Sequence, residues 1–126
     1  DAGARRVMPL PVSAPFHTPL MQPAAEVMQR AFEDVNWSTP RFPVVSNVDG
    51  SLQTNADSIR DSLVKQISAP VLWTACMATL RETGCTHFVE CGPGNVLSGL
   101  SKRIDKSIPV KSIEAVAAIE AGVTDF

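Results

Sequence analysis

Apolar residues in the first third of the chain recur at intervals of three and four, the spacing of one face of an α-helix. Thr18 followed by Pro19 is typical of a helix start, because a hydroxyl can accept a free backbone N–H and proline has none to leave unpaired. The pattern predicts a helix from Thr18 to about Val35. Its packing face would consist of the apolar stripe Leu20, Ala24, Val27, Met28, Ala31 and Val35.

Two further helices are predicted in the middle of the chain. Thr54, with Asp57 three residues later, resembles a capping box, and the helix behind it should continue until Pro70. Another helix should begin at about Trp73, and Gly84 can end it in a left-handed conformation. The apolar stripe of the first of these two helices is Ile59, Leu63, Val64 and Ile67.

Shorter elements are predicted between and outside these helices. Residues 42–48 suit a strand closed by Asp49 and Gly50, a pair that favours a tight turn. Residues 5–12 are typical of a strand after a helix end, "DAGA", and residues 114–122 of a short helix. The chain opens without an initiator Met, so we expect it to be a piece of a longer protein.

The last third has the pattern of an α/β unit. Residues 86–91 predict a strand that runs into the turn "GPGN", whose glycines permit a sharp change of direction. Asn95 would cap a helix over residues 96–104, and residues 107–113 would supply a final strand. Without a repeat or a linker, the sequence predicts one α/β domain.

Composition narrows the class of protein. With 126 residues and 44% hydrophobic side chains, the chain is long enough for one globular domain. A net charge of −2 without a basic run argues against nucleic acid as a partner. No apolar run approaches the roughly 20 residues of a membrane span, so we expect no membrane association and a cytoplasmic location. The three cysteines lack the spacing of a zinc site, which predicts reduced, mostly structural thiols and no metal.

His17 is the foremost candidate for chemistry. It lies between a proline-rich segment and a predicted helix start, a loop position where α/β proteins often display reactive side chains. Imidazole can accept and return a proton near neutral pH, so His17 is a candidate general base. The alternative is a histidine that only caps its own turn by a backbone hydrogen bond. His87, inside a predicted strand, is a weaker candidate.

Other candidates are less specific. Asn47 at the end of its strand and Gln66 near the end of its helix could point their amides into a shared cleft. The "GPGN" turn could hold a phosphate, but it lacks the spacing and lysine of a phosphate-binding loop, which favours a structural turn. A nucleophile is missing, because the chain contains no G-x-S-x-G elbow.

Four blocks, in this order and spacing, resemble the C-terminal portion of malonyl-CoA:acyl carrier protein transacylases. The blocks are "PVSAPFHTPLMQPAAEVM", "PVVSNVDG", "LVKQISAPVLW" and "FVECGPGNVLSGLSKRI", within about residues 5–105. The resemblance implies part of an α/β-hydrolase-like large subdomain, residues 11–126. It also implies that residues 1–10 end a ferredoxin-like small subdomain, with its last strand at Arg5 to Leu10.

The resemblance also implies roles for individual residues. His17 corresponds to the catalytic histidine, and Gln66 to the residue whose main-chain carbonyl orients it. Phe16 and Asn47 are candidates for the substrate pocket, and an aromatic Phe16 would crowd the α-methyl group of a branched acyl unit. The serine nucleophile, the oxyanion region and the malonate-binding arginine would lie in a missing N-terminal part, so we expect the fragment alone to be inactive.

The implied reaction moves malonyl from malonyl-CoA to the phosphopantetheine thiol of acyl carrier protein through an acyl-serine, in fatty acid biosynthesis. Coenzyme A thioester and the phosphopantetheine-bearing carrier are substrates, and no cofactor is expected. Three alternatives stay open. One is an acyltransferase domain of a polyketide synthase. Another is a noncatalytic phosphate- or ligand-binding α/β domain, and the third is a purely structural interaction domain.

Overall fold

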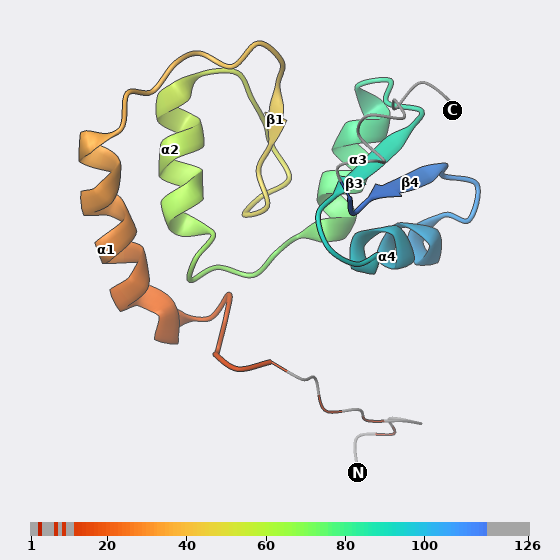
Figure 1. The fold of residues 1–126 in the computed structure, drawn as a ribbon, viewed down its shortest axis with the longest axis horizontal. Coiled ribbons are helices and arrows are strands. Elements are labelled where there is room, and N and C mark those ends of the chain that lie inside the picture. Colours follow the sequence, from red (N-terminus) through yellow and green to blue (C-terminus); the bar gives the residue numbers. More distant parts are fainter. Residues whose placement is uncertain (1–2, 4–6, 8, 10–11, 116–126) are drawn as a thin grey trace.

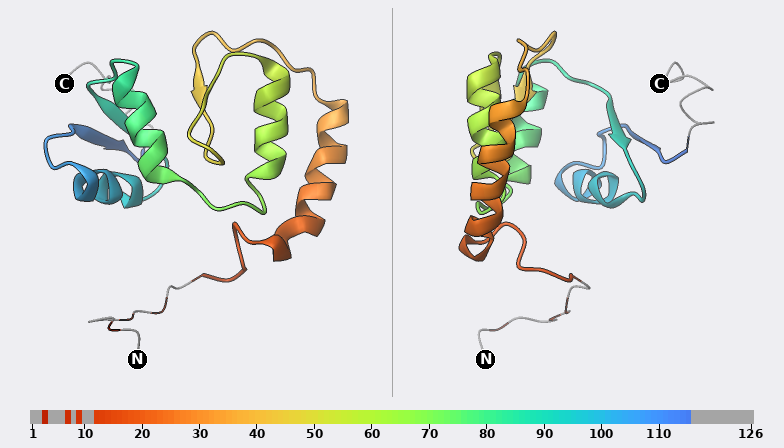
Figure 2. Two further views of the ribbon diagram at one scale, coloured as in Figure 1. Left: turned by 180° about the vertical axis from the view of Figure 1, so that it is seen from behind. Right: turned by 60° about the vertical axis from the view of Figure 1, so that its left-hand side comes forward.

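The computed structural model describes residues 3, 7, 9 and 12–115, a mixed α/β arrangement. One side consists of two neighbouring helices and a short hairpin; the other is a strand–helix–strand unit, with one helix between the two sides (Figure 1). Figure 2 shows from two further directions that α1 and α2 lie side by side. The predicted strand over residues 5–12 falls largely outside the described residues, as does the helix over residues 114–122.

The first predicted helix is confirmed as a continuous helical stretch. It consists of the 3-10 turn η1 (Pro19–Met21), α1 (Gln22–Ala31) and the 3-10 turn η2 (Phe32–Asp34). The predicted cap is wrong, because the Thr18 hydroxyl donates to the carbonyl oxygen of Pro15 at 2.8 Å instead of accepting from the helix. Val35 lies just beyond the end, in an extended conformation.

The predicted packing face of this helix is also wrong. Ala25 is the buried residue of α1, whereas Leu20 and Val27 of the predicted stripe are 75% and 59% exposed. In the described part of the chain, α1 packs beside α2 (Ala56–Lys65), and it does so through a different row of residues. That row, Gln22, Ala25, Gln29 and Phe32, lies next to α2 residues such as Val64.

The strand predicted over residues 42–48 is confirmed in a shorter form. β1 (Val44–Val45) pairs antiparallel with β2 (Leu52–Gln53), which the sequence pattern did not reveal because it is only two residues long. Gly50 closes the turn with φ +71°, as its position after Asp49 predicted. A Cβ atom at Gly50 would lie 2.8 Å from the Cβ of Ala75, so this turn packs directly on the helix that begins at Trp73.

Helix α2 begins one residue later and ends earlier than predicted. Asn55, not Thr54, caps it: the Asn55 side chain accepts from the backbone N–H of Ser58 at 2.9 Å. The regular helix ends at Lys65, and a loose turn over residues 66–69 separates it from Pro70. The following helix is confirmed as α3 (Trp73–Glu82), and Gly84 has φ +90° just after it.

The predicted α/β unit is confirmed. β3 (Phe88–Cys91) and β4 (Val110–Ile113) pair in parallel, with Phe88 opposite Val110, and α4 (Val96–Ile104) connects them. Most of the buried apolar residues lie in α3 and around β4: Cys76, Met77, Ile108 and Ile113. Many other apolar side chains among the described residues are exposed, so the core is smaller than the composition predicted. Among all the residues that the structure describes, no helix is long and apolar enough to cross a membrane.

Candidate functional site

His17 lies in the loop before η1 and is anchored by a residue 49 positions away. Its Nδ1 lies 2.8 Å from the main-chain oxygen of Gln66. The backbone of His17 has φ +58°, the left-handed region that a side chain other than glycine rarely adopts. The turn from Pro15 to Thr18, closed by the Thr18 hydroxyl, carries the histidine in this conformation.

The carbonyl of Gln66 is open to the histidine because of its place in α2. The last carbonyls of an α-helix have no partner within the helix. Gln66 is the C-cap residue, and its own N–H bonds back to the oxygen of Ser62 at 2.9 Å. Its oxygen therefore points past the end of the helix, where it accepts a hydrogen bond from the ring of His17.

This contact determines the tautomer of the neutral imidazole. A carbonyl oxygen only accepts hydrogen bonds, so Nδ1 of His17 must carry the hydrogen. In a neutral ring the other nitrogen, Nε2, is then unprotonated and can accept a proton. The side chain is exposed, so Nε2 is within reach of a reacting group.

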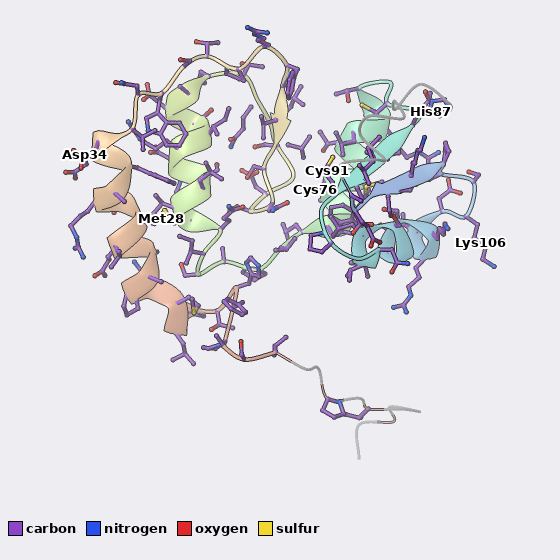
Figure 3. The ribbon with its side chains drawn as sticks, in the orientation of Figure 1. Met28, Asp34, Cys76, His87, Cys91 and Lys106 are labelled. Carbon is purple, nitrogen blue, oxygen red and sulfur yellow. The ribbon has the colours of Figure 1, made fainter. Side chains whose placement is uncertain are left out.

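The four residues that the resemblance assigns to the site line one hollow of about 400 Å³: Phe16, His17, Asn47 and Gln66. The polar side is His17, Asn47 and Gln66. The apolar side is contributed largely by the first helical stretch, including Met28, which is labelled on α1 in Figure 3. The complete lining is Phe16, His17, Met21, Ala24, Met28, Asn47, Gln66 and Ile67.

The two amides in this hollow meet each other. The Asn47 Nδ2 donates to the Gln66 Oε1 at 3.3 Å, and Asn47 is half-buried. Asn47 is also fixed through its backbone, because its carbonyl accepts from the N–H of Leu72 at 2.8 Å. The hairpin and the end of α2 are thus joined beside the histidine.

The methionines of the hollow were not recognised as site residues from the sequence. Met21, Ala24 and Met28 follow one another at intervals of three and four, so they share one helix face beside His17. The helical spacing of Ala24 and Met28 was visible, but it was interpreted as core packing. Only the contact between His17 and α2 turns that face into the wall of a site.

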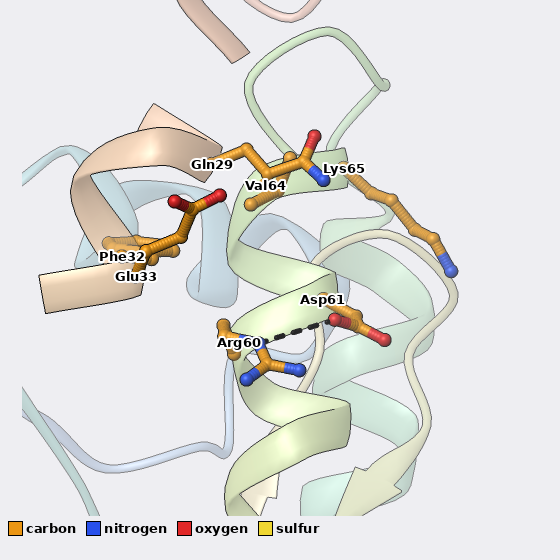
Figure 4. Close-up of a pocket in the computed structure, with 7 residues that line it drawn as sticks. All are labelled: Gln29, Phe32, Glu33, Arg60, Asp61, Val64 and Lys65. Carbon is orange, nitrogen blue, oxygen red and sulfur yellow. Dashed lines mark ion pairs between the residues drawn. The ribbon is translucent and has the colours of Figure 1, made fainter. Parts of the chain in front are cut away.

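A larger hollow, of about 530 Å³, lies between α1 and α2 away from the histidine (Figure 4). Its most prominent cation, Arg60, pairs with Asp57 at 3.3 Å and with Asp61 at 3.6 Å. These ion pairs are solvent-exposed, and the hollow shares no lining residue with that of His17. Its lining includes two carboxylates, Glu33 and Asp61, but no histidine.

The "GPGN" turn leads into a helix whose first turn is already occupied. The Glu90 carboxylate accepts from the N–H groups of Leu97 at 2.9 Å and Ser98 at 2.8 Å, and from the Ser98 hydroxyl at 2.6 Å. The predicted cap, Asn95, makes no capping bond with its side chain. The Ser98 hydroxyl, with these N–H groups, holds the pKa of Glu90 below its usual range. A buried anion therefore already takes the place that a phosphate would need.

His87, the other histidine, lies apart from this site. His87 is exposed just before β3, where its Nδ1 lies 2.9 Å from the Thr86 hydroxyl, and Figure 3 shows it in the part of the molecule that contains β3 and β4. Cys76, Cys85 and Cys91 are free thiols, as predicted, and only Cys76 is buried. Within the described ranges, no three His, Cys, Asp or Glu side chains are grouped to hold a metal ion.

Comparisons with known proteins agree on one group of enzymes. The chain is 43% identical to the malonyl CoA-acyl carrier protein transacylase of Salmonella typhimurium over 123 residues, which are 98% of this chain and 40% of that protein. The corresponding protein of Escherichia coli K12 is 42% identical over 122 residues, with 97% and 40% covered. No family model matches the chain.

Solved structures give the same result for the fold. The crystal structure of malonyl-CoA:acyl carrier protein transacylase from Xanthomonas oryzae pv. oryzae matches with a TM-score of 0.83 at 44% identity, covering 94% of this chain and 38% of that one. A malonyl transacylase in complex with its type II polyketide-synthase acyl carrier protein matches with a TM-score of 0.84 at 40% identity, covering 95% and 39%. These matches confirm the resemblance drawn from the four sequence blocks. The chain spans about 40% of the length of the curated relatives it matches.

Proposed function

We propose that this chain is the histidine-bearing part of a malonyl-CoA:acyl carrier protein transacylase. The observation that carries the proposal is the hydrogen bond from Nδ1 of His17 to the Gln66 carbonyl, which leaves Nε2 unprotonated beside a pocket. The similarity of nearly the whole chain to transacylases supports it. The matched relatives are much longer, so the serine nucleophile would come from residues outside these 126.

In this reaction His17 acts first as a base and then as an acid. Nε2 takes the proton of the serine hydroxyl while the serine oxygen bonds to the malonyl carbonyl carbon. The carbon–sulfur bond then breaks, and the imidazolium returns its proton to the sulfur of coenzyme A. In the second half, Nε2 takes the proton of the phosphopantetheine thiol, whose sulfur attacks the acyl-serine, and the proton returns to the serine oxygen.

The end of α2 suits this alternation. The C-terminal end of a helix carries a partial negative charge of roughly half a unit, which favours a cation nearby. The Gln66 carbonyl therefore stabilises the imidazolium to a moderate extent and fixes the ring, without the full charge of a carboxylate. Moderate stabilisation suits an exchange of one thioester for another, in which neither half-reaction is strongly downhill.

The pocket is suited to a small acyl group at the reacting carbon. Phe16, which is 55% exposed, and the apolar side chains Met21 and Met28 line the hollow together with His17. We propose that these side chains limit substitution at the α-carbon, and that the malonate carboxylate is bound by a cation outside this chain. The same proposal includes two further points. Residues 1–10 end a small subdomain and residues 11–126 belong to a large one, and the protein is located in the cytoplasm.

The second candidate function, phosphate binding by "GPGN", loses its support because Glu90 fills the first turn of α4. A role as an acyltransferase domain of a polyketide synthase uses the same chemistry and differs in the carrier protein. One structural relative is a malonyl transacylase in complex with a type II polyketide-synthase carrier. The two are separated by offering the enzyme carriers of both kinds.

The test is transfer of labelled malonyl by the complete protein that contains this chain. Incubation with radiolabelled malonyl-CoA should give a covalent acyl-protein, and addition of holo acyl carrier protein should move the label to the carrier. The apo carrier, which lacks the thiol, is the matched control and should stay unlabelled. An acyl-protein that never forms would overturn the proposal.

A further inference from the structure

The side chain of Gln66 is held by a residue to which the transfer chemistry gives no task. Gln66 uses its main-chain oxygen for His17 at 2.8 Å and its side-chain oxygen for the Nδ2 of Asn47 at 3.3 Å. Both contacts therefore meet in one residue. Any movement of the Gln66 side chain and backbone would be transmitted to the imidazole ring.

Gln66 occupies a position that needs such a support. It follows the last regular residue of α2, and the residues after it form only a loose turn before Pro70. Helix ends fray readily, because their last groups lack partners within the helix. A side-chain contact from another element limits that fraying at the carbonyl that the histidine requires.

Asn47 is itself well anchored, so it can serve as the fixed point. Its carbonyl accepts from the N–H of Leu72 at 2.8 Å, and its Oδ1 lies 3.9 Å from the thiol of Cys76. The same buried thiol donates to the carbonyl of Ser46 at 3.4 Å. Burial raises the pKa of Cys76, which keeps it a neutral donor.

We propose that Asn47 is a positioning residue: its amide holds Gln66, and through the Gln66 carbonyl it sets the orientation and tautomer of His17. This inference rests on the proposed transacylase function for its kinetic consequence, but the geometry it describes does not depend on that function. It gives the Gln66 side chain a task of its own. Asn47 thereby acts on the reaction without touching the substrate.

The kinetic test uses two apolar replacements of similar size, Asn47→Leu and Gln66→Met, alone and together. Each should lower kcat for malonyl transfer by about 10- to 100-fold with little change in KM, because a misplaced base slows chemistry more than binding. The double variant should be no worse than either single one, since both break the same contact. Losses that multiply would contradict the proposal and would indicate that Asn47 acts directly on the substrate.

Gln53 provides a matched control on the same hairpin. The Gln53 Nε2 donates to the Ser62 hydroxyl at 2.6 Å. Gln53 therefore also links the hairpin to α2, at a residue one helical turn before Gln66. Gln53→Leu should lower the thermal midpoint without lowering kcat per folded molecule. A loss of kcat in Gln53→Leu equal to that in Asn47→Leu would contradict the proposal, because activity would then depend on every link between hairpin and helix and not on the Asn47 contact in particular.

A spectroscopic test separates this proposal from the proposed function. In the wild-type protein the ring nitrogens of His17 should show a protonated Nδ1 by nitrogen-15 NMR, and Asn47→Leu should shift the ring toward a mixture of tautomers. Gln53→Leu should leave the spectrum unchanged. If the spectrum responds in this way but the protein transfers no malonyl, the positioning role of Asn47 stands and the proposed transacylase function fails. An unchanged His17 spectrum in Asn47→Leu would overturn the positioning role.

Discussion

The N-terminal end of α4 and the C-terminal end of α2 are occupied in opposite ways, and we call them the closed end and the open end. At the N-terminal end of α4, the Glu90 carboxylate takes the free N–H groups of Leu97 and Ser98 from within the same strand–turn–helix unit. At the C-terminal end of α2, the free carbonyl of Gln66 is taken by His17, a residue from a distant loop. The first end is satisfied by a buried group and offers no further chemistry. The second is satisfied by one nitrogen of a ring whose other nitrogen can react.

The largest expected effect is at the open end. His17→Ala removes the base while the Gln66 carbonyl returns to solvent, so transfer in the complete enzyme should fall by about 10²- to 10⁴-fold. The fold should persist, since His17 is exposed. Stopped-flow or quench-flow measurement of acyl-enzyme formation provides the rate, and a His87→Ala variant is the control. Acylation at the wild-type rate in His17→Ala would leave this histidine without a role.

The closed end should respond in stability and not in activity. Glu90→Gln removes the charge that accepts two backbone N–H groups and the Ser98 hydroxyl, and it turns a donor toward them. We expect the thermal midpoint to fall by several degrees, with kcat per folded molecule unchanged. Differential scanning calorimetry beside the transfer assay separates the two outcomes. A loss of kcat without a loss of stability would contradict this and would mean that Glu90 contributes to the transfer reaction.

The same carboxylate gives the closed end a pH dependence. The folded protein holds the pKa of Glu90 below its ordinary value of 4.5, chiefly through the Ser98 hydroxyl. Its contribution to stability is therefore complete above that value and is lost as the pH falls through the lower folded pKa. Denaturation curves can be measured between pH 3 and 7, about the range where such a carboxyl titrates. The free energy of unfolding of the wild type should fall as the pH is lowered, and this fall should be smaller in Glu90→Gln. Parallel curves for the two proteins would contradict this.

These two ends also differ in how far the sequence predicted them. The histidine in its proline-rich loop was evident as a candidate, but the Gln66 carbonyl followed only from the resemblance, because a main-chain oxygen leaves no mark on the sequence. Glu90 was missed as a cap. Asn95, directly before the helix, has the favoured residue type, whereas the actual cap comes from the preceding strand and depends on how the glycine turn folds back.

The elements were easier to predict than their faces. Helix starts and the strand–helix–strand unit follow from local residue preferences, and they are present in the structure. The packing face of α1 was wrong because Leu20 and Val27 have the spacing of a core stripe, although α2 packs against the row that contains Ala25. The choice of face depends on the neighbour, which the spacing of residues within one helix does not specify.

A smaller effect is expected in the hairpin that carries Asn47. Gly50→Ala places a methyl group 2.8 Å from the Cβ of Ala75 and forces alanine into a left-handed conformation. The cost should be roughly 1–3 kcal/mol of folding free energy. Because the hairpin moves, kcat should fall with it, by less than in Asn47→Leu. Urea denaturation gives the first value and the transfer assay the second; unaltered stability would mean that the turn relaxes freely.

The smallest effect concerns the choice of acyl group. Phe16→Ser opens one side of the hollow, so transfer of methylmalonyl relative to malonyl should rise by about tenfold or less, because a single methyl group contributes little and Phe16 is half-exposed. Competition between the two thioesters measures the ratio directly. Val96→Ser, at an exposed site on α4, is the control. An unchanged ratio in Phe16→Ser would assign selectivity to other residues.

If the Gln66 carbonyl fixes His17 with its reactive nitrogen free, the ring must be in one defined tautomer. Nitrogen-15 NMR of the intact protein, selectively labelled at histidine and measured where the ring is neutral, distinguishes the two tautomers, with His17→Ala assigning the signal. We expect His17 to carry its hydrogen on Nδ1, with an unprotonated Nε2. A neutral ring protonated at Nε2 would mean that the Gln66 carbonyl does not hold His17 and that Nε2 is not free to act as a base.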